Sequence, residues 1–123
     1  RLLDGLLDAA VHLNTGSLPE LFCGFPRDER LGPVPYPVAC HPQAWSVASV
    51  FMLVQAMLGM QVLGFEQRVV INSPVMPTRL DWLRIEDLRV GSGTISLIVH
   101  PTPAGAAIET IKKHGEVSVE IRN

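Results

Sequence analysis

The sequence predicts an α+β fold, with helices in the first half of the chain and strands in the second. Residues 2–13 carry apolar side chains at helical spacing, and residues 42–60 are apolar almost throughout. Beyond Gly64 the chain is rich in β-branched residues that alternate with polar ones. Of the 123 residues, 47% are hydrophobic and 18% are charged, which is enough apolar content for a packed core.

An amphipathic helix is expected at the start of the chain. Its apolar side chains recur three and four residues apart, at Leu2, Leu3, Leu6, Leu7, Ala10 and Leu13. Gly16 is suited to end the helix in the left-handed conformation. Because the periodicity is present from the first residues with no capping residue before it, we expect the chain to be a fragment of a larger protein.

A second helix is expected over residues 42–60. Pro42 suits the first turn of a helix, where a backbone N–H has no intrahelical partner. Apolar side chains occupy nearly every face, and a helix that is apolar all round is normally buried all round. One short partner helix cannot cover those faces. We therefore expect further helices outside this sequence and, without them, self-association through residues 42–60.

A small antiparallel β-sheet domain is expected over residues 61–123. The segment 67–77 is a β-branched strand ended by prolines. Residues 83–100 form a hairpin with its turn at 91–93, and residues 107–123 form another with its turn at 114–115. The expected order is two helices, in residues 1–60, followed by about five strands.

Several classes of function are excluded by composition. The net charge is -2 and the chain has no basic cluster beyond residues 112–114, so we expect no nucleic-acid partner. No apolar run reaches the roughly 18 residues that span a membrane. Cys23 and Cys40 do not make a disulfide framework, which favours a cytoplasmic protein. His12 and His41 lack further ligands at metal-site spacing, and we expect neither a metal nor a cofactor.

The loop between the two helices, residues 17–46, carries the candidate site. It holds most of the prolines, both cysteines and the only tyrosine. Carbohydrate sites combine flat rings, which cover apolar sugar faces, with amides and carboxylates that bind hydroxyl groups. The loop supplies both kinds of group: the rings are Phe22, Tyr36 and Trp45, and the hydrogen-bonding groups are Glu20, His41 and Gln43. We predict that it forms the rim of a sugar-binding cleft.

Each of these residues also has a purely structural interpretation. Glu20 follows Pro19, and on spacing alone it is most typical of a helical first turn, where the dipole favours an acidic residue. Trp45 and Tyr36 could pack rather than stack on sugar. The two cysteines are expected to be buried thiols. Asp28 and Glu29 could serve as a proton donor, but their charged surroundings favour a solvated turn.

Two motifs together resemble a known family. "LPEL" at 18–21, followed by "AC-x-PQAWS" at 39–46, resembles the C-terminal end of the amylo-α-1,6-glucosidases, glycoside hydrolases of the glycogen-debranching type. "LDWLRIEDLRVG" at 80–91 resembles the β-rich tail of bacterial members. The resemblance implies that residues 1–60 are the last helices and the active-site loop of an (α/α)6 barrel.

The resemblance also implies a role for single residues. Glu20 corresponds to the catalytic general base, and Trp45 and Gln43 match the family's motif at the sugar pocket. Tyr36 and Phe22 remain candidates for sugar contact through their rings alone. Inverting hydrolysis needs a second carboxylic acid about 6.5–9.5 Å away, and the family's proton donor lies upstream of this sequence. The chain alone is therefore expected to be inactive on its α-glucan substrate. The alternative is a non-catalytic helix-plus-sheet module that binds a glycan or a protein.

Overall fold

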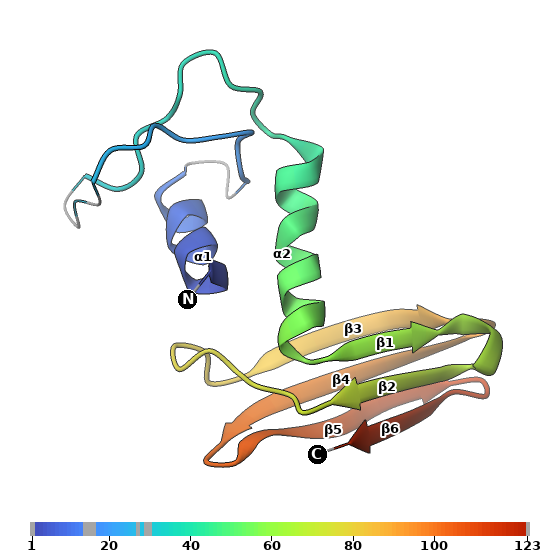
Figure 1. Ribbon diagram of the computed structural model, residues 1–123. Helices are drawn as coiled ribbons and strands as arrows, with labels where there is room; N and C mark the ends of the chain where they lie inside the picture. Colours follow the sequence, from blue (N-terminus) through green and yellow to red (C-terminus); the bar gives the residue numbers. More distant parts are fainter. Residues whose placement is uncertain (1, 14–16, 27, 29–30, 123) are drawn as a thin grey trace. The chain divides into compact units, whose positions relative to one another are not determined.

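The computed structural model describes residues 2–13, 17–26, 28 and 31–122, which fall into two compact units, residues 1–54 and 55–123. Helix α1 spans Leu2–His12, and helix α2 spans Ala44–Met57 and crosses the boundary between the units (Figure 1). Neither helix is long and apolar enough to cross a membrane, and the search covers only the described residues.

Helix α1 is amphipathic, as its sequence predicts. Leu3 and Ala9 are its buried residues, and the His12 Nδ1 donates a hydrogen bond to the carbonyl of Asp8 at 2.8 Å. The interhelical loop returns to the end of this helix: a Cβ on Gly32 would lie 2.6 Å from the His12 ring. Gly16, the expected end of the helix, lies outside the described residues.

Helix α2 is shorter than the predicted 42–60. The Gln43 carbonyl accepts the first helical N–H, from Val47, at 3.0 Å, so Pro42 precedes the helix. The helix stops before Gly59, whose φ of 54° is left-handed and incompatible with a continuing right-handed helix. Within this chain the apolar faces of α2 are largely uncovered: Ser46 is its buried residue, whereas Phe51 and Met52 are 72% and 69% exposed.

The second unit contains two three-stranded sheets, with strand orders β1-β2-β6 and β3-β4-β5. The strands are β1 (Met60–Leu63), β2 (Arg68–Asn72), β3 (Leu83–Val90), β4 (Gly93–Thr102), β5 (Gly105–His114) and β6 (Ser118–Arg122). A 3-10 turn, η1 (Gly64–Glu66), joins β1 to β2. All neighbours are antiparallel except β2 and β6, which run parallel.

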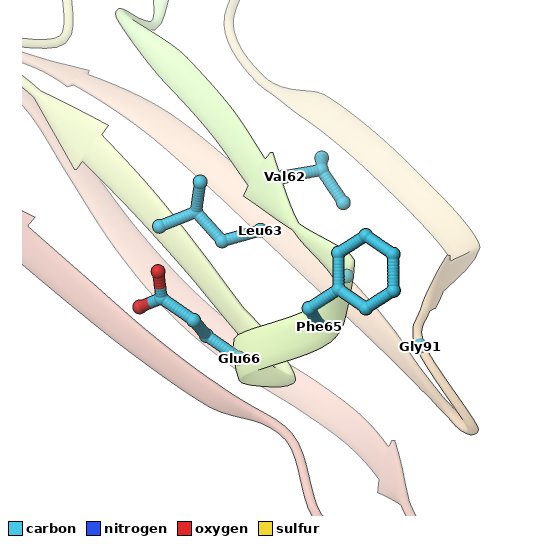
Figure 2. Close-up of a pocket in the computed structure, with 6 residues that line it drawn as sticks. Val62, Leu63, Phe65, Glu66 and Gly91 are labelled. Atoms are coloured by element: carbon cyan, nitrogen blue, oxygen red, sulfur yellow. The ribbon is translucent and has the colours of Figure 1, made fainter.

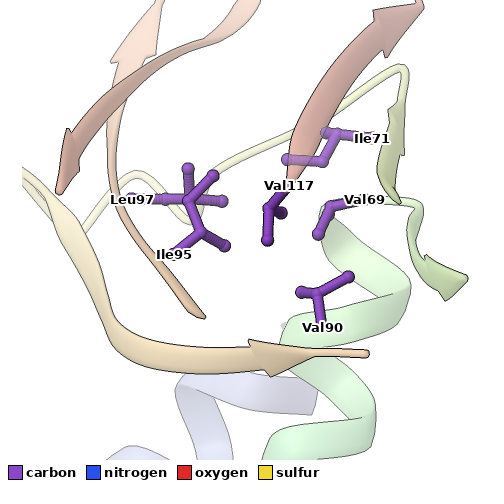
Figure 3. Packing of buried hydrophobic residues seen from close by; sticks show 6 residues of the cluster. All are labelled: Val69, Ile71, Val90, Ile95, Leu97 and Val117. Carbon is purple, nitrogen blue, oxygen red and sulfur yellow. The ribbon is translucent and has the colours of Figure 1, made fainter. Parts of the chain in front are cut away.

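The core of this unit lies between the two sheets. Each sheet contributes apolar side chains to it: β2 and the residue before β6 from one sheet, and β3 and β4 from the other. The cluster consists of Val69 and Ile71 from β2, Val90 from β3, Ile95 and Leu97 from β4, and Val117 just before β6. Figure 3 shows these six side chains converging from both sheets. The unit is a small β-sandwich.

The expected last helices of an (α/α)6 barrel followed by one antiparallel sheet are not found. Helices of such a barrel pack side by side along their lengths, whereas α1 and α2, as far as the structure describes them, share at most a marginal contact. The described residues form two helices and two sheets, one of them mixed. The largest fully buried side chains belong to the second unit. Its two sheets cover each other's apolar faces, whereas α1 and α2 do not cover each other.

Strand pairing corrects the predicted topology in two places. The hairpin over 83–100 is confirmed as β3 and β4. The hairpin over 107–123 is wrong: β5 pairs with β4, and β6 crosses to pair with β2. Strand β1, unexpected at the end of the predicted helix, covers the other edge of β2. Both changes give β2 a neighbour on each side, which satisfies its backbone hydrogen-bonding groups.

Candidate functional site

The candidate site lies on two segments of the first unit that pair with each other, residues 17–23 and 34–43. Their backbone hydrogen bonds run from Glu20 N to Cys40 O at 2.8 Å, from Cys23 N to Val34 O at 3.0 Å, and from Gln43 N to Leu18 O at 3.0 Å. An isolated antiparallel bridge joins Phe22 and Pro35. Leu18 and Pro19 are buried and anchor the first segment. The loop is therefore shaped, not a linker.

Glu20 is held at both its backbone and its side chain. Its carboxylate Oε2 accepts a hydrogen bond from the Cys40 N–H at 3.3 Å, in addition to the backbone bond between the same residues. Among the described residues, this N–H is the partner shown for the Glu20 carboxylate. The residue as a whole is half-buried.

The candidate sugar-contacting residues follow the same two segments. Tyr36 comes directly after the bridge to Phe22 and is 46% exposed. Trp45, in the first turn of α2, is 60% exposed. Gln43 uses its backbone N–H and carbonyl in holding the loop to the helix, which leaves its half-buried side chain for other contacts. The two exposed rings offer apolar surface of the kind that covers a sugar face.

A side-chain contact closes the base of the paired segments. The His41 Nε2 lies 3.1 Å from the Ser17 Oγ and 3.3 Å from the Ser17 carbonyl oxygen. A carbonyl oxygen only accepts hydrogen bonds, so the second contact requires Nε2 to carry the proton. His41 therefore serves as a donor between the two segments.

The cysteines and the alternative acids take no part in a metal centre that the structure describes. Cys23 is half-buried, with its Sγ 3.5 Å from the Pro35 carbonyl, while Cys40 is exposed, contrary to the expected buried thiol. In the described ranges, no three His, Cys, Asp or Glu side chains gather closely enough to hold a metal ion. Asp28 is exposed, and Glu29 lies outside the described residues.

A groove in the second unit was not expected from the sequence. It has a volume of about 520 Å³ and is lined by Val62, Leu63, Gly64, Phe65, Glu66 and Gly91 (Figure 2). Phe65 is fully exposed, and Glu66 is engaged by Arg68. The feature of the sequence that could have pointed to this groove is Phe65, a large aromatic residue inside the short turn that begins at Gly64. The lining is mostly apolar, so this groove suits contact with an apolar group better than catalysis.

The clearest electrostatic perturbation also lies in the second unit. Arg122 donates from Nε to the Glu120 Oε1 at 2.7 Å, and Arg68 donates to the Glu120 Oε2 at 2.8 Å. The hydrogen bond from Arg122 lowers the pKa of the Glu120 carboxyl, and the same contact raises the pKa of Arg122. Arg68 lies on β2, and Glu120 and Arg122 lie on its neighbour β6. The Arg68–Glu120 ion pair therefore links the two strands at the surface.

No protein-family model, characterised protein or solved structure matches this chain. The functional assignment therefore depends on the residues of the loop and on the geometry that holds them.

Proposed function

We propose that the first unit supplies the general base and sugar-contacting rings of a glycoside hydrolase that acts on α-linked glucans, of the glycogen-debranching type. The observation that carries the proposal is the Glu20 carboxylate, which is held by the Cys40 N–H on a paired loop. The exposed rings of Tyr36 and Trp45 lie on the same loop and at its junction with α2. The paired motifs at 18–21 and 39–46 resemble those of the amylo-α-1,6-glucosidases.

Glu20 has the chemistry that an inverting mechanism requires of its base. A general base must be ionised and within hydrogen-bond reach of the attacking water. The Cys40 N–H fixes Oε2 through a charge-assisted hydrogen bond, which leaves Oε1 to accept the proton of that water. The proton donor comes, in this proposal, from another part of a larger enzyme, at the separation of about 6.5–9.5 Å that admits a water molecule.

A second candidate function is a non-catalytic module that binds a glycan or a protein through the same loop. The same contact supports this function as well. A Glu20 carboxylate that accepts a hydrogen bond from Cys40 could have the purely structural role of holding the loop together. The loop further exposes Phe25, Leu31 and Val38, which suit an apolar partner surface. The cytoplasm is the proposed location of either protein, because Cys23 and Cys40 are free thiols.

Glucan binding by the chain tests the proposal directly. Titration with maltotetraose, followed by amide NMR shifts, is expected to show weak binding at residues 17–46. Trp45→Ala is expected to weaken that binding about tenfold, because the ring provides the apolar surface for the sugar face. Glucose release is expected to be absent, since losing one of two cooperating groups costs several powers of ten in rate.

The matched control is Trp82→Ala. Trp82 belongs to the second unit and is 57% exposed, against 60% for Trp45. Any nonspecific effect of removing an exposed indole should therefore be the same in both variants. Equal effects of the two substitutions would contradict the proposed sugar contact. Rapid glucose release by the pure chain would contradict the dependence on a second acid.

Self-association through α2 is a separate expected outcome. Phe51 and Met52 expose large apolar side chains on this helix. Multi-angle light scattering should detect dimers or larger species at high protein concentration, and Phe51→Ser with Met52→Ser should return the chain to a monomer. Trp82→Ser, at an exposed ring of the second unit outside the groove, is the control and should leave association unchanged. A monomeric unsubstituted chain would refute this expectation.

A further inference from the structure

We propose that His41 is a positioning residue for the Glu20 carboxylate, and that it acts through the Cys40 peptide. The inference rests on the proposed function, because it concerns the general base of that same site. His41 directly follows Cys40, whose N–H and carbonyl are both bonded to Glu20. Movement of His41 therefore moves the one donor that the structure shows at Glu20 among the described residues.

Two sets of hydrogen bonds hold segments 17–23 and 34–43 together on the helix-α2 side of the Glu20–Cys40 pair. The His41 Nε2 contacts both the Oγ and the carbonyl oxygen of Ser17, and the Gln43 N–H donates to the Leu18 carbonyl. Ser17 and Leu18 precede Glu20 by three and two residues. The approach of the Cys40 N–H to Oε2 is thus determined by contacts made on either side of Pro42.

The contribution of His41 differs from that of Gln43. The Gln43 contact uses the backbone and survives any side-chain substitution except proline. The His41 contact uses a side-chain N–H, and Ser17 and His41 are both at the surface or only partly buried. Replacing His41 consequently removes a cross-link without opening a cavity in the core. The expected effect is a looser Cys40 N–H in a loop that stays folded.

Amide hydrogen exchange on the chain measures that looseness without any substrate. In His41→Leu, the Cys40 amide is expected to exchange about tenfold faster, as expected for loss of a typical hydrogen bond. Amides of helix α1 should keep their exchange rates. In His41→Gln, the side-chain amide nitrogen reaches a similar position and donates, so the Cys40 rate should return to within about twofold of its original value.

The NMR shift of the Cys40 amide at neutral pH gives a second reading. Because this N–H points at the Glu20 Oε2, Glu20→Gln should move the Cys40 amide shift upfield and so identify the contact. His41→Leu should move the shift in the same direction, and His41→Gln should restore it. His114→Leu, at an exposed histidine in the second unit, is the control and should change neither the exchange rate nor the amide shift.

Three results would overturn the proposal. They are an unchanged Cys40 exchange rate in His41→Leu, a failure of His41→Gln to restore it, and faster exchange throughout residues 2–54, which would indicate a general structural role. The maltotetraose titration distinguishes failure of the His41 proposal from failure of the proposed function. If exchange behaves as expected but Trp45→Ala leaves glucan binding unchanged, the function fails while His41 still positions Glu20.

Discussion

Replacing Ile71 by alanine is expected to lower the free energy of unfolding of residues 55–123 by about 2–5 kcal/mol. Ile71 is completely buried between the two sheets, where it packs in the cluster with Val69, Leu97 and Val117. The shorter side chain loses its own burial and leaves a cavity that the surrounding strands fill only in part. Because small domains are stable by about 5–15 kcal/mol, this loss is a large fraction of the total.

The matched control is Ile121→Ala. Ile121 lies directly opposite Ile71 on the neighbouring strand β6 but is 46% exposed, so the same substitution there removes much less buried surface. Urea unfolding followed by the circular dichroism of the strands compares the two variants. Equal destabilisation would show that the core does not lie between the sheets as described.

The second large effect is expected for Gly59→Ala, which should destabilise the same unit by about 2–4 kcal/mol. Gly59 has a φ of 54°, and an added Cβ would lie 2.1 Å from the backbone oxygen of Asn72. The backbone cannot move aside easily, because the Asn72 N–H donates to the Gly59 carbonyl at 3.2 Å. Left-handed backbone and a steric clash therefore act together at this position.

Gly64→Ala serves as the control for this substitution. A Cβ at Gly64 would meet its nearest atom, the Gly91 N, at 3.6 Å, which is an ordinary contact. Its stability is expected to change by less than about 1 kcal/mol. Thermal unfolding of both variants tests the difference, and a Gly59→Ala variant as stable as Gly64→Ala would refute the close approach of β1 and β2 at this end.

The prolines around Glu20 have a structural role in the paired loop segments. Pro33 and Pro35 keep the start of the second segment from becoming helical, so that it can pair with residues 17–23. Pro37 lies in the turn that the Ala39 N–H closes on the Tyr36 carbonyl at 3.0 Å. Pro19 is buried beside Leu18, which fixes the backbone directly before Glu20. In the proposed role of general base, a carboxylate held in this way would lose little conformational freedom on substrate binding, which is the preorganisation that such catalysis requires.

The sequence by itself determined the local features of this protein. Helical spacing in residues 2–13 predicted α1, and the glycines at 91 and 93 with flanking β-branched runs predicted the β3–β4 hairpin. The prolines, rings and carboxylate of residues 17–46 identified the candidate site. These features depend on neighbours in the chain, and periodicity and turn chemistry report them directly.

Only the tertiary structure decided how distant segments pair. The alternation of Val117, Val119 and Ile121 predicts a strand but does not say which strand it joins, and burial of Val117 between the sheets placed β6 beside β2 rather than β5. In the same way, nothing near Glu20 in the sequence reveals that the Cys40 N–H binds its carboxylate. Both outcomes depend on contacts between residues far apart in the chain, where many pairings are compatible with one local pattern and the burial of apolar surface selects among them.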